Sequence, residues 1–355
     1  MSRAKQLALK AKGDTSPNPL VGAVIVKGRE VIAEGWHHRC GCDHAEIIAL
    51  KKAGRRAEGA KMYVTLEPCY HYGRTPPCVD RVIASGIKEV IIGTKDPNPL
   101  TNGKSMAKLR RAGIKVKVGI LQQDLKAINE PFFKYAIGNM PFIAVKSAQS
   151  LDGKIATAAG QSKWITSNAA RQYARKVRDE FDAILVGINT VLKDDPRLNG
   201  SRKTKHLKKI ILDSSLRIPL KARLFARTAP SDVFVATTAK APRGKKAILQ
   251  KKGATVIVCP QRKGRLDLRW LFKELAGLKI TSILIEGGAH VIGNALQERL
   301  VDKAYIYMAP IILGDQNALS SVVGIGTSDI NRAVRLKRMV LRQIKGDIFL
   351  EGYLK

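Results

Sequence analysis

The sequence is poor in cysteine and has no long hydrophobic run. Five cysteines among 355 residues are too few for a disulfide framework, and their spacing suits metal binding in a reducing compartment. No apolar run approaches the roughly 18 residues that a membrane-spanning helix requires. The first segment, Met1–Gly13, lacks the apolar core and the cleavage site of a secretory signal. We therefore expect a cytoplasmic protein whose first helix lies within Met1–Gly13.

Acidic residues are also scarce, because 29 Asp and Glu oppose 63 Lys and Arg and leave a net charge of +34. The excess is spread along the chain: residues 1–139 hold 24 basic and 12 acidic residues, and residues 140–355 hold 39 and 17. The basic clusters at Arg202–Lys209, Arg243–Lys246 and Arg262–Arg265 contain no interleaved aromatic residues for base stacking. This pattern predicts non-specific affinity for polyanions at low salt rather than a specific nucleic-acid partner.

The strongest chemical signal is His44-Ala45-Glu46, followed by Pro68-Cys69 and by Cys78. One imidazole and two thiolates, from His44, Cys69 and Cys78, predict a zinc site that keeps its fourth tetrahedral position for water. Zinc lowers the pKa of such a water towards neutrality, and Glu46 is a spare carboxylate suited to moving protons. This combination is typical of the zinc-dependent base deaminases. It predicts hydrolytic removal of an amino group from an aromatic ring, with Glu46 as the catalytic residue.

The other three cysteines leave an alternative open. Cys259 lies in an apolar stretch and is interpreted as a core residue. Cys40 and Cys42 precede His44 closely and could complete a closed, structural zinc site, which would make the chain a zinc-stabilised binding protein. Cysteine pairs of structural zinc sites usually have two to four residues between them. We therefore favour Cys40 and Cys42 as loop residues beside an open site.

The periodicity of apolar residues divides the chain into two α/β units, at residues 1–139 and 140–355, as its length suggests. In the first unit, strands alternate with helices, which is typical of a three-layer α/β domain. Its expected strands are at 20–26, 31–34, 62–66, 89–93 and 115–118. His44 and Glu46 open a helix at 44–53, and Cys69 and Cys78 flank the start of a second helix at 77–85.

The second unit is expected to be rich in buried strands. They are predicted at 142–147, 183–187, 209–213, 233–237, 255–259, 282–286 and 303–308, whereas 323–338 gives mixed signals. This unit contains no strand–GxGxxG–helix fingerprint, so a Rossmann domain is not expected. The turn Gly287-Gly288 after a strand is physically suited to phosphate, because free backbone N–H groups meet a helix N-terminus there.

Longer motifs resemble one family. SPNPLVGAVIV, GWHHRCGCDHAE and TLEPCYHYGRTPPC resemble the deaminase domain of the bifunctional riboflavin-biosynthesis deaminase–reductase family. KSAQSLDGKIA, SKWITS, VGINTVLKDDPRL, ILDSSLRIP and IEGGAHVIGNAL resemble its reductase domain, in the same order. The resemblance spans essentially the whole chain. It implies an α/β fold: an N-terminal three-layer cytidine-deaminase-like domain, followed by a dihydrofolate-reductase-like α/β reductase domain.

The resemblance also implies a function in riboflavin biosynthesis. A zinc-dependent pyrimidine deaminase domain at 1–139 would deaminate 2,5-diamino-6-(5-phosphoribosylamino)pyrimidin-4(3H)-one. An NADPH-dependent reductase domain at 140–355 would then reduce 5-amino-6-(5-phosphoribosylamino)uracil to the ribitylamino product. The alternative is a nucleic-acid-editing zinc deaminase with a basic binding domain, which accounts for the charge. It does not account for the eight residues between Cys69 and Cys78, where small nucleic-acid deaminases usually have two.

Cofactors, partners and reductase residues follow from the same resemblance. The cofactors are one Zn²⁺ and NADPH, and the partner is a small phosphoribosylaminopyrimidine. No specific nucleic acid and no membrane are expected, and a homo-oligomer is compatible with the fold. The residues along the NADPH are Ala148, Trp164, Thr190, Asp194, Gly288, Ala289, His290, Val291, Ile292, Gly293 and Asn294. The residues facing the substrate are Ser162, Arg178, Leu198, Arg202 and Glu286, with Arg202 displaced by about one position from a second family arginine.

Several further residues have two interpretations each. Lys146 and Asp194 are both candidates for protonating or polarising the substrate of the reductase. Asn18 either hydrogen-bonds the edge of the pyrimidine or serves only the turn in which it lies. His37 is either a substrate contact or a surface loop residue. Asp43 stands where the family usually has proline, which puts the rigidity of this loop in question.

Overall fold

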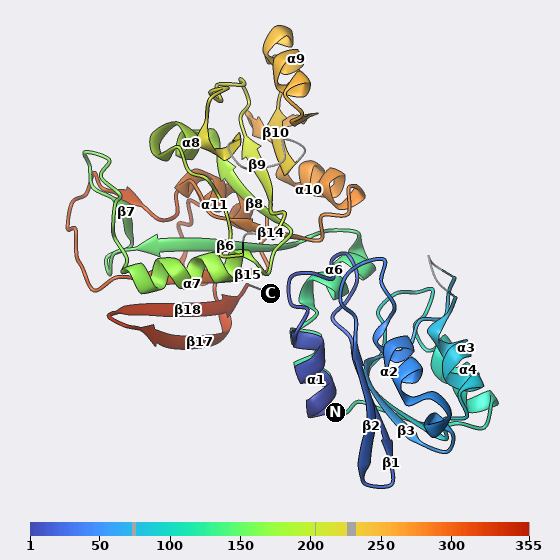
Figure 1. Ribbon diagram of the computed structural model, residues 1–355. Helices are drawn as coiled ribbons and strands as arrows, with labels where there is room; N and C mark the ends of the chain where they lie inside the picture. The colour runs from blue at the N-terminus through green and yellow to red at the C-terminus, as the bar shows by residue number, and fades with distance from the viewer. Residues whose placement is uncertain (73–75, 203, 226–231, 355) are drawn as a thin grey trace. The chain divides into compact units, whose positions relative to one another are not determined.

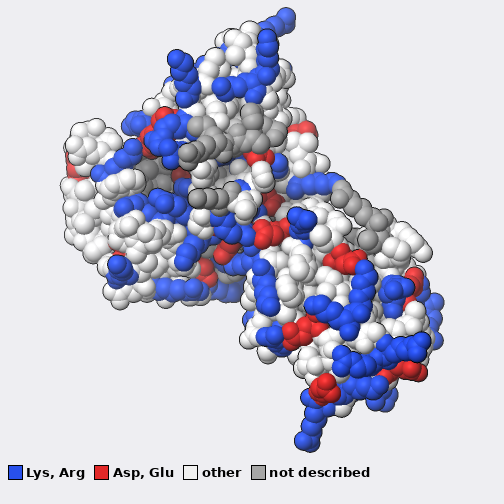
Figure 2. Space-filling model, viewed as in Figure 1, with Lys and Arg blue, Asp and Glu red and all other residues white. Residues whose placement is uncertain are grey.

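The computed structural model describes residues 1–72, 76–202, 204–225 and 232–354. It divides into two compact units, Met1–Met140 and Pro141–Lys355 (Figure 1). Residues 73–75 of the loop between Cys69 and Cys78, and residue 203 of a basic cluster, lie outside the described residues. None of the helices described has the length and apolar composition of a membrane span. Lys and Arg side chains are scattered over the visible face of both units rather than gathered on one of them (Figure 2).

The first unit is built on a five-stranded sheet in the order β2-β1-β3-β4-β5. β1 pairs antiparallel with β2 and β3, and the remaining pairs are parallel. The strands are β1 (Gly22–Lys27), β2 (Glu30–Trp36), β3 (Lys61–Leu66), β4 (Glu89–Thr94) and β5 (Lys115–Val118). The helices are α1 (Ser2–Leu9), α2 (Ala45–Ala53), η1 (Gly54–Ala57), α3 (Cys78–Ala84), α4 (Lys104–Arg111), α5 (Gln122–Ala127) and α6 (Glu130–Gly138).

Alternating side chains of β1 supply two cores, one on each face of this sheet. Ala23 and Ile25 belong to the larger core, to which α2, α3 and α4 also contribute. Val24 packs on the other face with Ala4 and Leu7 of α1. The unit therefore has the three layers that the sequence predicts.

The contact between α2 and β2 is unusually close. A Cβ atom at Gly35 of β2 would overlap the carbonyl oxygen of Ala45, the first residue of α2. Ala45 and Ala49 are fully buried on this side of the helix. Small residues on both elements thus allow the backbone of α2 to lie directly on the sheet.

The second unit is built on a nine-stranded sheet in the order β11-β10-β9-β8-β14-β6-β15-β18-β17. Its pairs are parallel from β11 to β15, and β18 and β17 add an antiparallel edge. Its strands are β6 (Phe142–Gln149), β8 (Ala183–Gly187), β9 (Lys208–Leu212), β10 (Val233–Thr237), β11 (Thr255–Val258), β14 (Ser282–Ile285), β15 (Lys303–Met308), β17 (Lys337–Ile344) and β18 (Asp347–Tyr353). Two small sheets pair β7 (Lys154–Ala156) with β16 (Leu319–Ser320) and β12 (Gln261–Arg262) with β13 (Arg265–Leu266).

The helices of this unit are α7 (Asn168–Arg178), α8 (Ile188–Asp194), η2 (Arg223–Phe225), α9 (Arg243–Lys251), α10 (Leu268–Gly277), α11 (Ala289–Gln297) and η4 (Ile330–Arg332). Ser167 is the N-cap of α7, and its hydroxyl accepts the N–H of Ala170 at 3.3 Å. Ala170, Ala174 and Val177 of α7 pack into a core with Phe142 of β6. This spacing leaves the arginines of α7 on other faces of the helix.

The C-terminal hairpin is the main departure from the sequence prediction. The segment 323–338, which has mixed signals, contains the short helix η4 and the start of β17. Seven of the eight residues of β17 are exposed, so the strand lacks the alternation of buried and exposed residues that identifies a strand in a sequence. The predicted strands up to 308 agree with the structure within two residues at each end.

Candidate active sites

The three predicted zinc ligands lie together in the first unit. His44 caps the N-terminus of α2, Cys78 is the first residue of α3, and Cys69 lies in the turn after β3. Their donor atoms all lie within 4.8 Å of one another. His44 Nδ1 is 3.1 Å from Cys78 Sγ and 3.6 Å from Cys69 Sγ. These separations fit one imidazole and two thiolates around a single tetrahedral zinc ion, with one position open.

Cys40 and Cys42 do not belong to this cluster. Across the described residues, His44, Cys69 and Cys78 are the only group of three His, Cys, Asp or Glu close enough to share a metal. Cys40 and Cys42 are half-buried free thiols in the preceding loop. The donor set therefore favours an open site over a closed structural one.

Glu46 lies two residues after the first ligand, His44, and is buried, with only 3% of its surface exposed. Burial raises the pKa of Glu46 to about 7. A carboxylic acid with a pKa near the working pH can both accept and return a proton, which is what a general acid–base catalyst requires. Hydrogen bonding from Cys78 lowers the pKa of Cys69, which favours the thiolate that a metal binds.

His37 is a buried residue and not a surface loop residue, so that interpretation of the sequence is wrong. Its Nδ1 lies 3.1 Å from the Asp43 carbonyl oxygen, and its Nε2 lies 3.0 Å from Asn18 Nδ2. Burial lowers the pKa of His37, which favours the neutral form of the ring. A neutral ring that donates from Nδ1 and accepts at Nε2 satisfies both partners and fixes the Asn18 amide.

Asp43 stabilises the loop that carries His44. Its carbonyl oxygen contacts His37, and its carboxylate accepts from Lys51 of α2 at 2.6 Å. The loop is therefore fixed by hydrogen bonds at the position where the family usually has proline.

Glu67 is a buried residue that the sequence reasoning missed. It precedes Pro68-Cys69, and its carboxylate accepts the backbone N–H of Asp96, Gly103 and Met106 at 3.3, 3.1 and 3.4 Å. These bonds tie the Cys69 turn to the loop before α4 and to the first turn of that helix. A carboxylate at the end of an otherwise apolar strand is the signal that could have identified it.

A cavity of about 660 Å³ lies in the second unit. Its wall includes most of the residues that the resemblance assigns to the reductase: Ala148, Ser162, Trp164, Arg178, Thr190, Asp194, Leu198, Glu286, Gly288, Ala289 and Ile292. His290, Val291, Gly293 and Asn294 continue α11 without lining this wall, and Arg202 does not line it either. Lys146 lines it, together with arginines that the resemblance did not assign, among them Arg175.

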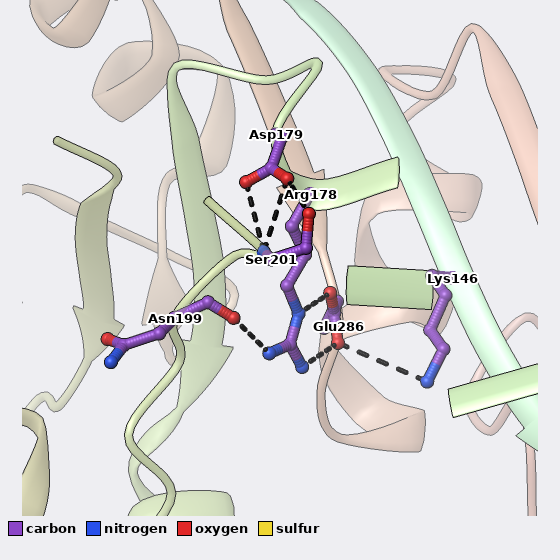
Figure 3. Close-up of polar contacts among 6 residues, drawn as sticks. All are labelled: Lys146, Arg178, Asp179, Asn199, Ser201 and Glu286. Atoms are coloured by element: carbon purple, nitrogen blue, oxygen red, sulfur yellow. Dashed lines mark hydrogen bonds and ion pairs between the residues drawn. The ribbon is translucent and has the colours of Figure 1, made fainter. Parts of the chain in front are cut away.

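A partly buried ion pair joins two predicted substrate residues at the cavity wall (Figure 3). Arg178 Nε and Nη2 donate to the two oxygens of Glu286 at 2.6 and 2.8 Å, and Arg178 Nη1 donates to the Asn199 carbonyl at 2.8 Å. Lys146 Nζ lies 4.0 Å from Glu286. Burial alone would raise the pKa of Glu286, but the positive charges of Arg178 and Lys146 overcome it and lower that pKa.

The N-terminus of α11 opens onto the same cavity. Gly288 caps the helix with a φ of +78°, a conformation that glycine adopts without strain. Free N–H groups at a helix start are suited to a pyrophosphate. Trp164 is 67% exposed at the cavity wall and Arg171 lies over its ring, so the residue is accessible to a ligand. These groups fit a dinucleotide such as NADPH.

Comparisons with known proteins decide the family. A model of the RibD C-terminal domain matches residues 141–350, and a model of the cytidine and deoxycytidylate deaminase zinc-binding region matches residues 1–94. The riboflavin biosynthesis protein RibD of Aquifex aeolicus is 42% identical, covering 99% of this chain and 98% of that protein. The chain belongs to the RibD family.

Solved RibD structures share its fold. The RibD of Acinetobacter baumannii is 36% identical and matches 100% of this chain and 97% of its own with a TM-score of 0.89. A Thermotoga maritima structure described as a diaminohydroxyphosphoribosylaminopyrimidine deaminase/5-amino-6-(5-phosphoribosylamino)uracil reductase is 35% identical, with the same coverage and a TM-score of 0.87.

Membership of the RibD family confirms the predicted fold class and the predicted kind of activity. The first unit is a cytidine-deaminase-like, zinc-binding domain, and the second is a reductase domain of the NADPH-using RibD type. The chain is a bifunctional deaminase and reductase of riboflavin biosynthesis. Its cofactors are zinc and NADPH.

The RibD deaminase unit should show a pH dependence that originates at Asp96. Burial raises the pKa of Asp96 to about 6, whereas an unfolded aspartate titrates at about 3.9. Between these values the folded state binds more protons, so this group makes the free energy of unfolding fall as the pH rises from about 4 to about 6. Asp96→Asn removes this fall. Urea unfolding of the wild type and of Asp96→Asn between about pH 4 and 7 measures the free energy of unfolding. A difference in this free energy that stays constant with pH would contradict the assignment to Asp96.

Glu46→Gln should abolish the deaminase activity of this RibD chain without loss of zinc. Removing a general acid–base group typically costs about 10²- to 10⁴-fold in rate, and Gln preserves the shape of the buried side chain. Ammonia release measures the rate, metal analysis measures the zinc, and the NADPH-dependent activity of the same chain is the control. Loss of the metal would show instead that Glu46 is needed to hold it.

Proposed function

We propose that this chain carries out two successive reactions on one phosphorylated pyrimidine. Its first unit removes the amino group of 2,5-diamino-6-(5-phosphoribosylamino)pyrimidin-4(3H)-one by hydrolysis. Its second unit reduces the resulting 5-amino-6-(5-phosphoribosylamino)uracil to the ribitylamino product with NADPH. The observation that carries this proposal is the coexistence in one chain of a buried carboxylate beside the zinc donors and a cation-lined cavity at the start of α11.

Glu46 is the proton carrier of the proposed deamination. Its buried carboxylate accepts a proton from the attacking water and passes it to the ring nitrogen, and it moves a second proton to the leaving amine. One water is consumed and one ammonia is released, so the protons balance. Zinc held by His44, Cys69 and Cys78 supplies the Lewis acidity that activates water near neutral pH. Asn18, fixed by His37, offers its amide to the edge of the pyrimidine.

NADPH supplies the hydride of the proposed reduction. Backbone N–H groups from Gly288 onward bind the cofactor's pyrophosphate at the start of α11, and Trp164 packs along it. The hydride adds to a carbon of the ribosyl unit, and the oxygen or nitrogen bonded to that carbon takes one proton. Lys146 and Asp194 of the cavity wall are the candidate donors of this proton. Burial lowers the pKa of Lys146, which makes its ammonium group a stronger acid than that of an exposed lysine.

We also propose where the enzyme acts and what it binds. We place the enzyme in the cytoplasm, with small phosphorylated pyrimidines as substrates and without a specific nucleic-acid or membrane partner. A homo-oligomer is compatible with this function. The editing of nucleic acids is not favoured, because the second unit matches a reductase domain where that function needs a basic binding domain. The scatter of Lys and Arg over both units agrees with this choice (Figure 2).

Incubation of the purified zinc-loaded chain with the diaminopyrimidinone substrate tests the proposal. Ammonia and the deaminated pyrimidine should form without NADPH, because hydrolysis needs no reductant. The ribitylamino product should appear only when NADPH is added, with one NADPH oxidised for each molecule of product. Product analysis by mass spectrometry and absorbance at the NADPH band measures both steps. A chain that performs neither step on this substrate would overturn the proposal.

A further inference from the structure

The substrate of the proposed reduction carries a phosphate. Resting on that proposed function, we infer which residues hold this phosphate. Phosphate is bound best by arginines that donate charge-assisted hydrogen bonds from more than one side. Several Lys and Arg side chains line the reductase cavity, and they differ in how many of their donors are already in use.

Arg178 has donors left for a ligand. A guanidinium has five N–H groups, and Arg178 uses three of them on Glu286 and Asn199 (Figure 3). The remaining N–H groups, one on each terminal nitrogen, belong to a side chain of the cavity wall. The bidentate pair with Glu286 fixes the plane of the guanidinium, so these donors have a fixed direction.

Arg202, the second arginine that the family resemblance predicts, is bound to Asp179 and lies outside the cavity wall. The Asp179 carboxylate accepts the backbone N–H of Ser201 at 3.1 Å and of Arg202 at 3.2 Å (Figure 3 shows Ser201). It also accepts the Ser201 hydroxyl, and Arg202 Nη2 donates to the Asp179 carbonyl at 3.2 Å. This clamp needs Gly200, because a Cβ atom there would overlap Asp179 Oδ1.

Arg175 is better placed than Arg202 to bind a phosphate in the cavity. It precedes Arg178 by three residues on α7, so the two side chains are neighbours on the helix surface. Its side chain is exposed and lines the same cavity. Within the described part of the chain, Arg175 has no ion pair or hydrogen bond from its guanidinium. All of its donors are therefore free for a ligand.

The other cations of the wall are less suited to this phosphate. Lys146 already pairs with Glu286 at 4.0 Å. Arg171 is stacked on Trp164 at 4.2 Å, and Lys163 precedes Trp164, so both lie on the side predicted for the cofactor. Arg197 follows Asp195 by two residues, and the backbone N–H of Arg223 donates to Asp195 at 2.8 Å. Neither of these two arginines belongs to α7, so no helix spacing sets their guanidinium groups beside that of Arg178.

We propose that Arg175 binds the phosphate of the pyrimidine substrate together with Arg178, and that Arg202 takes no part. Rigid spacing on α7 places the two guanidinium groups on one side of the cavity. Arg175 supplies the second charge of the phosphate site, whereas the family resemblance assigns Arg202 to the substrate.

The test compares Arg175→Gln with Arg202→Gln and with Lys176→Gln in the full-length chain. Lys176 is the matched control, since it is exposed in the same last turn of α7, carries the same charge and does not line the cavity. Reductase kinetics are measured with 5-amino-6-(5-phosphoribosylamino)uracil and with its dephosphorylated form, and deaminase activity of the same chain reports correct folding. We expect Arg175→Gln to raise the KM for the phosphorylated substrate about tenfold or more, as loss of a charge-assisted hydrogen bond does.

The other parameters should stay near their wild-type values. These are kcat, the KM for NADPH and the KM for the dephosphorylated substrate. Arg175→Lys, which keeps the charge, should bring the KM for the phosphorylated substrate part of the way back to the wild-type value. Lys176→Gln and Arg202→Gln should leave all KM values within about twofold, since a charge that only stabilises the helix terminus does not affect binding. The inference is overturned if Arg175→Gln behaves like Lys176→Gln, if it raises the KM for NADPH instead, or if Arg202→Gln has the larger effect. A wild-type chain that does not reduce either pyrimidine would refute the proposed function itself.

Discussion

The deaminase site depends on how closely α2 lies on the sheet. Because Gly35 presents no side chain to Ala45, the start of α2 is held at a fixed height, and His44 caps it there. Helix α3 packs into the same core, and its first residue, Cys78, thereby comes within 3.1 Å of His44. Two of the three metal donors, on His44 and Cys78, are thus positioned by helix starts that pack in one core. Glu67 fixes the turn that carries the third donor, Cys69, by accepting backbone N–H groups.

The reductase site is organised by charge instead of close packing. Arg178 and Glu286 are 108 residues apart in the sequence and meet in a bidentate pair at the cavity wall. Burying such a pair costs solvation energy, and good bidentate geometry together with further hydrogen bonds offsets that cost. The Asn199 carbonyl takes one of those donors, so the pair also fixes the loop that forms one side of the cavity.

Sequence patterns predicted the features that are local or chemically distinctive. The alternating strands, the helix starts and the grouping of His44, Cys69 and Cys78 all follow from short-range periodicity and from ligand chemistry. The burial of His37 could not be read in this way, because it depends on the carbonyl of Asp43 and the amide of Asn18. Strand β17 was missed because it is exposed, and Arg175 because cavity walls assemble from distant segments.

The clamp between Asp179 and the loop after Leu198 has a consequence for how this chain can vary. A side chain at position 200 would displace the Asp179 carboxylate, which could then no longer accept the backbone N–H groups of Ser201 and Arg202. The loop keeps its present conformation only while position 200 lacks a side chain. A substitution there would release the arginine at 202 from the clamp.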